Sequence, residues 1–150
     1  MKNMDSLIEK KDPIIRPGYM YLASRQPSAL LSDTLILDIL LNETEDTIYF
    51  KDAESKFILN NRKHLAQFGA ESQEEMIGKS DADLYPKAFA DKCREDELRV
   101  MKTGIPLIDR VEQAINSKGE VITFSTCKYP LYDQNGNIVG TWGVSHDITK

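Results

Sequence analysis

Two groups of acidic residues carry the side chains that a metal site or an acid–base pair would need. Asp81 and Asp83 are separated by one residue, and Asp133 begins the string Asp133-Gln134-Asn135-Gly136-Asn137, which imitates part of a calcium loop. The first pair lacks the further oxygen ligands and the glycine of such a loop, and Ser80 indicates a helix start, where the helix dipole favours carboxylates. A hairpin turn accounts for the second string. We therefore expect no metal site.

Cysteine and histidine are the other residues that could do chemistry. Cys93 and Cys127 lie far apart without metal-ligand spacing, so the sequence predicts two buried free thiols and neither a disulfide nor a zinc site. The histidines are His64 and His146. The sequence contains no recognisable set of nucleophile, base and orienting residue, and no glycine-rich phosphate loop. We therefore expect no enzymatic activity.

Length and composition narrow the class of protein. The chain has 150 residues, a formal charge of −5, 29% charged residues and 41% hydrophobic residues, which is typical of one globular domain that can enclose a small cavity. Lysine and arginine form no basic stripe, so we expect no nucleic acid partner. No run of about 18 apolar residues and no secretory signal is present, so we expect a cytoplasmic protein without membrane contact.

The residues that precede the main domain predict one apolar helix. Residues 1–29 contain prolines and a glycine among mixed residues and are expected to be an irregular lead-in. In residues 30–45, leucine and isoleucine leave only a narrow polar stripe at helical spacing, so this helix needs cover on more than one side. We predict a homodimer through this helix, with Leu37, Leu40 and Leu41 in the interface. The alternative is a monomer in which residues 1–29 fold over the helix.

The remaining residues alternate between strand and helix patterns in a fixed order. Strands are predicted at 47–50 and 57–59, then short helices, a longer helix at 86–103, and strands at 107–116, 121–131 and 138–147. Asn135-Gly136 predicts a type I′ turn between the last two strands. This order predicts an α+β fold: a five-stranded antiparallel sheet with helices on one face and an N-terminal flanking helix.

Five strings in this order resemble a PAS domain, the sensory module of bacterial signalling proteins. They are DTIYFKD at 46–52, FILNN at 57–61, IGKSDADLYP at 77–86, MKTGIPL at 101–107, and the final Asp147-Ile148-Thr149. The resemblance assigns residues 46–150 to a PAS sensory domain. It implies a cavity between the inner sheet face and the helices, a flanking helix that often dimerises, and a C-terminal exit into an effector such as a histidine kinase or a diguanylate cyclase.

The resemblance also bears on cofactors. Flavin-binding relatives use a cysteine in an Asn-Cys-Arg type motif, which this sequence lacks. Haem-binding relatives take an axial histidine from a helix in the middle of the domain, whereas His64 is expected on the first short helix and His146 beside the exit. We therefore expect no cofactor, neither flavin nor haem, and a small organic ligand of unidentified structure is the remaining possibility.

Strand alternation predicts which residues face the cavity. If the more apolar faces look inward, the lining is mostly apolar with a few polar groups, as in small-molecule sites. The alternative is that aromatic side chains fill this space, and a register error of one residue would exchange the two faces. The predicted lining consists of Ile48, Phe50, Phe57, Leu59, Met101, Val111, Gln113, Ser125, Cys127, Tyr129, Trp142 and Val144.

The predicted signal exit consists of Lys51, Asp147, Ile148 and Thr149. The resemblance implies that Asp147 is held near the first strand, where Lys51 is a plausible ion-pair partner. Our hypothesis is a bacterial signal-transduction sensor that detects a small ligand or partner and relays it through the flanking helices of a dimer to an output domain outside this chain. The alternative is a ligand-free PAS module for protein–protein interaction or dimerisation.

Overall fold

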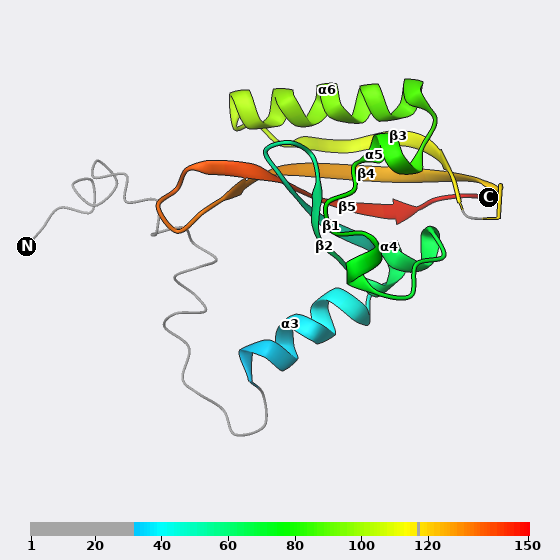
Figure 1. The fold of residues 1–150 in the computed structure, drawn as a ribbon, viewed down its shortest axis with the longest axis horizontal. Helices are drawn as coiled ribbons and strands as arrows, with labels where there is room; N and C mark the ends of the chain where they lie inside the picture. Colours follow the sequence, from blue (N-terminus) through cyan, green and yellow to red (C-terminus); the bar gives the residue numbers. More distant parts are fainter. Residues whose placement is uncertain (1–31, 117) are drawn as a thin grey trace, which may run out of the picture.

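The computed structural model describes residues 32–116 and 118–150 (Figure 1), so the lead-in predicted at 1–29 lies outside the described residues. Helices and strands follow the predicted order. They are α3 (Asp33–Asn42), β1 (Thr47–Asp52), β2 (Phe57–Asn60), α4 (Arg62–Gln67), the 3₁₀ helix η1 (Gln73–Glu75), α5 (Asp81–Leu84), α6 (Lys87–Thr103), β3 (Leu107–Ile115), β4 (Val121–Tyr132) and β5 (Ile138–Asp147).

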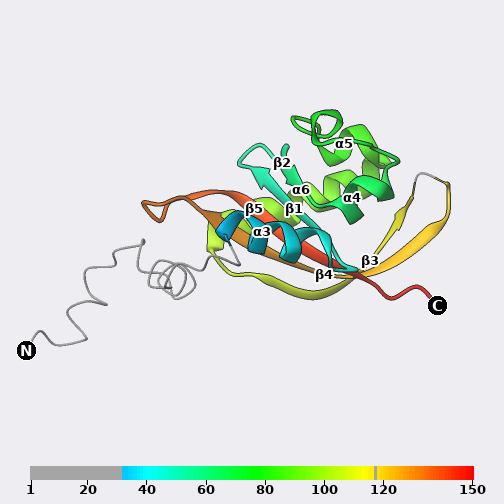
Figure 2. The ribbon, with the colours of Figure 1, turned by 90° about the horizontal axis from the view of Figure 1, so that it is seen from below.

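The five strands form one antiparallel sheet in the order β2-β1-β5-β4-β3. The last strand therefore lies beside the first, with Thr47 opposite Ser145 and Asp52 opposite Gly140. Helices α4, α5 and α6 lie on one side of this sheet (Figure 2). The predicted α+β fold, a five-stranded antiparallel sheet with helices on one face, is confirmed.

Short-range signals explain where several elements begin and end. The Asn61 side chain accepts a hydrogen bond from the His64 backbone N–H and caps α4, while Gly104 ends α6 with a left-handed φ of 68°. The β4–β5 hairpin forms where predicted, but the type I′ turn is wrong, because Asn135 does not adopt positive φ. Instead the Asp133 carboxylate accepts hydrogen bonds from the backbone N–H groups of Asn135 and Asn137.

The hydrophobic core lies between β1, β2 and the short helices. Tyr49, Phe57 and Met76 form its buried centre. Tyr49 lies directly opposite Gly143 on β5, and a Cβ atom at position 143 would lie 2.5 Å from the Tyr49 ring. Glycine is therefore required at this position for the tyrosine ring to lie against the sheet.

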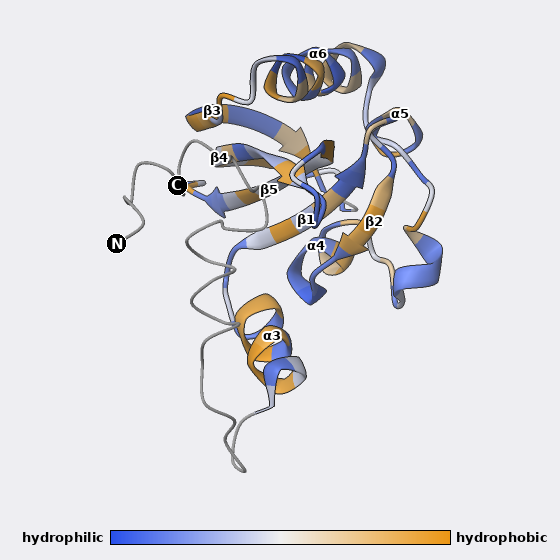
Figure 3. Cartoon of the chain, turned by 90° about the vertical axis from the view of Figure 1, so that its left-hand side faces the viewer, coloured by the Kyte–Doolittle hydropathy of each residue, from blue (hydrophilic) through white to orange (hydrophobic). Residues whose placement is uncertain are grey.

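Helix α3 lies apart from the sheet, and none of its residues is buried in this single chain. It begins at Ser32, whose hydroxyl accepts a hydrogen bond from the Leu35 N–H. Colouring by hydropathy shows an apolar α3 (Figure 3), and Leu37 and Leu40 are 54% and 65% exposed. No helix in the described part of the chain is long and apolar enough to cross a membrane.

Candidate functional site

A small cavity lies between the inner face of the sheet and the helices. Its volume is about 30 Å³, which leaves room for one or two water molecules. Its walls are unusually polar for the centre of a domain. The lining residues are Thr47, Tyr49 and Lys51 on β1; Phe57 on β2; His64 and Gln67 on α4; Asp81 on α5; Tyr85; Phe89 and Cys93 on α6; Glu112 and Ala114 on β3; Phe124, Thr126 and Lys128 on β4; and Ser145 on β5.

Of the residues predicted to line the cavity, Phe57 does so, and Met101 is half-buried without lining it. The other ten face away from the helices, so their predicted inward orientation is wrong. They are Ile48, Phe50, Leu59, Val111, Gln113, Ser125, Cys127, Tyr129, Trp142 and Val144. The grouping of these residues on one face is confirmed, because cross-strand partners share a face.

The two faces of the sheet are exchanged relative to the prediction because the inner face is the more polar one. On β1 the buried residues are Thr47, Tyr49 and Lys51, while the more apolar Ile48 and Phe50 are half-buried on the outside. Phe57 faces inward as predicted, because a bulge between Phe50 and Lys51 shifts the β2 register and places Phe57 opposite Lys51.

The outer face carries an aromatic ladder across three strands. The Trp142 ring stacks on Phe50 with centroids 5.9 Å apart and on Tyr129 with centroids 4.4 Å apart. Cys127 lies on the same face, where it is half-buried. Of the two thiols predicted to be buried, only Cys93 is.

Lys51 is the centre of a buried charge cluster on the inner face. Its ammonium Nζ lies 2.5 Å from Asp81 Oδ2 and 2.6 Å from Glu97 Oε1, and its side chain is only 2% exposed. The rings of Tyr49 and Phe57 face the same ammonium, with centroids 5.2 and 4.8 Å away. Three charged groups from β1, α5 and α6 are thus tied together inside the domain.

A second buried lysine faces the cavity from β4. Lys128 is 2% exposed, and its Nζ lies 3.9 Å from Glu112 Oε1, which is an ion pair beyond hydrogen-bonding distance. An ammonium can donate three hydrogen bonds. Lys128 therefore has donor capacity toward the cavity that the nearest carboxylate does not use.

The surroundings shift several pKa values in the cavity. Burial lowers the pKa of Lys51, but the charges of Asp81 and Glu97 outweigh it and hold this pKa above its usual range. Burial and the nearby Lys51 charge lower the pKa of His64 to about 3, so His64 is neutral at physiological pH. Burial raises the pKa of the Cys93 thiol to about 12 and also raises that of Tyr85. The cavity at neutral pH thus holds the charged Lys51 beside a neutral imidazole and a protonated thiol.

The predicted Lys51–Asp147 ion pair is wrong, because antiparallel pairing places these residues at opposite ends of β1 and β5. Lys51 lies opposite Thr141, six residues before Asp147. The Asp147 carboxylate instead accepts a hydrogen bond from the Thr149 N–H at 2.8 Å, and hydrogen bonds from Thr149 lower the Asp147 pKa. Asp147 is therefore part of a local turn at the exit.

The exit is attached to β4 and to the segment before β1. The Ile148 N–H donates to the Thr123 carbonyl, and the Thr123 N–H donates to the Thr149 hydroxyl. His146 Nδ1 lies 2.6 Å from Asp46 Oδ1. The residues that enter and leave the sheet are thus held side by side at one end of the molecule.

The arrangement suits reversible binding by hydrogen bonds and charge. Among residues 32–116 and 118–150, no group of three or more histidine, cysteine, aspartate or glutamate side chains is placed to hold a metal ion. Lys51, Glu97 and Lys128 are the residues of the candidate site that sequence reasoning misplaced or missed. The sequence offered one signal for them, which is that Lys51 and Lys128 each lie within a run of strand-forming residues. This signal is weak, because a lysine in a strand is ordinarily solvent-exposed.

Comparison with known proteins agrees with this geometry. The sequence profile of the family described as PAS fold matches residues 41–150. The methanogenesis regulatory histidine kinase FilI of Methanothrix harundinacea is 30% identical over 112 residues, which is 73% of this chain and 12% of FilI. The chain thus spans about an eighth of the length of this curated relative.

Solved structures share the same fold. The VqmA dimer of Vibrio cholerae is 21% identical with a TM-score of 0.71, over 79% of this chain and 52% of that one. The PAS domain of a Colwellia psychrerythraea protein is 19% identical with a TM-score of 0.64, over 78% of this chain and 98% of that one. Phage VqmA in complex with DPO is 25% identical with a TM-score of 0.62, over 78% of this chain and 54% of that one.

Proposed function

Since this chain belongs to the PAS fold family of sensory modules, we propose that it binds a small polar molecule in the inner cavity and signals its presence to an effector domain. The observation that carries the proposal is the charged wall of this cavity. Lys51, Asp81, Glu97, Glu112 and Lys128 are all buried there or directly beside it. Buried charges cost stability that apolar side chains of similar volume would not, so their presence in a cavity indicates a binding role.

Lys128 is the residue we assign to direct ligand contact. Its ammonium is only loosely paired with Glu112, and the Tyr85 and Phe89 rings line the same cavity with their centroids 4.6 Å apart. A flat molecule with a hydrogen-bond acceptor would satisfy the ammonium and pack against these rings. Phage VqmA, which has the same fold, was solved in complex with DPO, and this supports a small-molecule ligand here.

The ligand requires more room than the closed cavity has. The wall opposite the sheet is built by short helices, because Gln67 belongs to α4 and Tyr85 follows α5. Short helices with few buried contacts open at lower free energy than the sheet. We therefore propose that α4 moves outward when the ligand enters, while Asp81 on α5 stays paired with Lys51.

The effector and the dimer complete the proposal. FilI is a histidine kinase. We propose that this module works in the cytoplasm upstream of an effector, with α3 as its dimer contact. A ligand shifts the arrangement of the flanking segments only if its affinity differs between two arrangements. The exit at Asp147-Ile148-Thr149 is the segment that would carry this shift.

Native mass spectrometry of freshly purified protein tests the binding proposal. We expect an extra mass that is lost on denaturation. DPO serves as a defined probe by thermal shift, with Lys128→Met as the binding variant and the exposed Lys56→Met as its matched control. A bare chain in native spectra and no stabilisation of wild type by DPO would contradict the assignment.

The small cavity favours one second candidate. A volume of about 30 Å³ suits a core closed around water, so the fold could act as a ligand-free interaction module. In that case the charge cluster would define the packing of α5 and α6 on β1 and bind nothing. The same spectra separate the two functions, since this module would remain bare in every preparation.

A further inference from the structure

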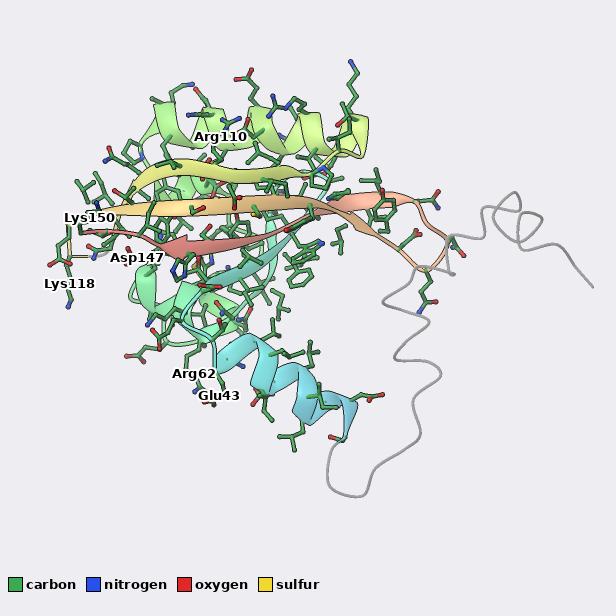
Figure 4. All side chains as sticks on the ribbon, turned by 180° about the vertical axis from the view of Figure 1, so that it is seen from behind. Glu43, Arg62, Arg110, Lys118, Asp147 and Lys150 are labelled. Atoms are coloured by element: carbon green, nitrogen blue, oxygen red, sulfur yellow. The ribbon has the colours of Figure 1, made fainter. Side chains whose placement is uncertain are left out.

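A larger groove lies at the end of the sheet where the chain enters and leaves it. Its volume is about 260 Å³, close to the lower limit of small-molecule sites. The α4 side supplies Lys63 and the β3–β4 hairpin supplies Lys118 and Ile122. Glu45 comes from the segment before β1, and Asp147 is the last residue of β5. Figure 4 shows Lys118 and Asp147 at the same end of the molecule.

This groove borders the inner cavity. Thr47, Gln67 and Phe124 line both spaces. All three side chains are uncharged, and the Gln67 Nε2 donates a hydrogen bond of 2.8 Å to the Tyr85 hydroxyl. Rotation of Gln67 away from this contact breaks one neutral hydrogen bond and moves one of the three side chains that line both spaces.

A competing groove on another side offers a poorer route. It has a volume of about 250 Å³ and shares only Asp81 with the inner cavity. Asp81 is held by Lys51 at 2.5 Å, so opening there would separate a buried ion pair. Arg94 also ties the rim of this groove by donating to the Ala53 carbonyl and the Ser55 hydroxyl at 3.1 and 2.6 Å.

We propose that the groove beside Asp147 is an outer binding site through which the ligand reaches the inner cavity, and that Gln67 is the residue that separates the two. This inference rests on the proposed function. The route selects small neutral polar molecules, because an ion would leave the solvated charges of Lys63 and Lys118 to pass three uncharged side chains. A ligand in the inner cavity meets the Tyr85 hydroxyl, so it competes with Gln67 for the same partner.

Cys93 provides a test that needs no knowledge of the ligand. Cys93 is 5% exposed and lines the inner cavity, so the reaction rate of its thiol with methyl methanethiosulfonate reports access to that cavity. The measurement uses the full chain with Cys127→Ser, at one mildly alkaline pH. Gln67→Ala should raise the rate about fivefold, the factor expected for one neutral hydrogen bond.

Two blocking variants distinguish the routes. Ile122→Trp fills the groove beside Asp147 and should slow the modification of Cys93, whereas Ala82→Trp fills the competing groove and should leave it unchanged. Loss of stability alone would accelerate the reaction, so slowing by Ile122→Trp cannot come from partial unfolding.

The proposal is overturned if Ala82→Trp slows the reaction and Ile122→Trp does not. It is equally overturned if the rates of all variants follow their global unfolding constants measured in urea, because Cys93 would then react only from the unfolded chain. Native mass spectrometry tests ligand retention separately. If it shows a bare chain, the proposed function fails, but the Cys93 reaction rates still show whether the groove is the route into the inner cavity.

Discussion

Replacing Lys51 by methionine tests the buried charge cluster most directly. Methionine keeps an unbranched apolar side chain but leaves Asp81 and Glu97 without their ammonium, and the Glu97 Oε2 has no hydrogen-bond partner among the described residues. Removing one member of a buried ion pair costs about 3–5 kcal/mol. A domain is typically stable by only about 5–15 kcal/mol, so this single change should remove a large part of the total.

Urea unfolding followed by the fluorescence of Trp142 measures the effect. We expect a lower midpoint with an unchanged m-value, and a melting temperature lower by roughly 6–20 °C. Lys56→Met is the matched control, because Lys56 Nζ pairs with Glu54 at 3.0 Å while both side chains are exposed, and it should leave the midpoint unchanged. The Lys51 charge adds no pH dependence to the free energy of unfolding near neutrality. Lys51 is protonated there in both states, because its pKa is raised in the folded state and is already near 10 in the unfolded state.

A triple variant separates charge from packing. Lys51→Met combined with Asp81→Asn and Glu97→Gln removes the uncompensated charges and should regain part of the lost stability. If Lys51→Met unfolds at the wild-type urea concentration, the reasoning about buried charge is refuted. If the triple variant is no better than the single one, the loss comes from packing and hydrogen bonds.

Three further outcomes follow from the structure. His64 takes up a proton only near pH 3 when folded but near pH 6.5 when unfolded, so stability should fall on acidification across this window, and His64→Phe should weaken that fall in urea titrations at several pH values. Gly143→Ala places a Cβ 2.5 Å from the Tyr49 ring and should cost about 1–3 kcal/mol of unfolding free energy, checked by calorimetry. If α3 is the dimer contact, Leu37→Asp with Leu40→Asp should give a monomer in sedimentation velocity, whereas a wild-type dimer that persists in this variant would rule α3 out.

The elements of the fold could be predicted from the sequence, because local signals determine them. Pro86 and Gly104 border α6, and the strand from 138 to 147 has the bounds that alternation predicts. The position of α3 within residues 30–45 follows from its leucine and isoleucine residues and the narrow polar stripe that they leave at helical spacing. Such signals depend on neighbours along the chain, which the sequence displays directly.

The candidate site could be predicted only in part. Alternation correctly grouped Ile48, Phe50, Trp142 and Val144 on one face. The prediction that the more apolar face lies inward was wrong, because this domain buries Lys51 on the inner face. A buried lysine is predictable only when its carboxylate partners are known, and Asp81 and Glu97 are remote from it in sequence. The wrong prediction of Asp147 as the ion-pair partner of Lys51 has the same origin, because strand register determines which residues lie close together.

The neighbouring positions of β1 and β5 also determine how the domain responds to tension. The chain enters β1 at Thr47 and leaves β5 at Asp147, at the same end of one antiparallel pair. Hydrogen bonds in such a pair run across the strands, so a pull on the two flanking segments loads them one after another from that end. The first contacts to carry the load are Asp46–His146 and Thr47–Ser145, so the sheet opens first beside Asp147-Ile148-Thr149.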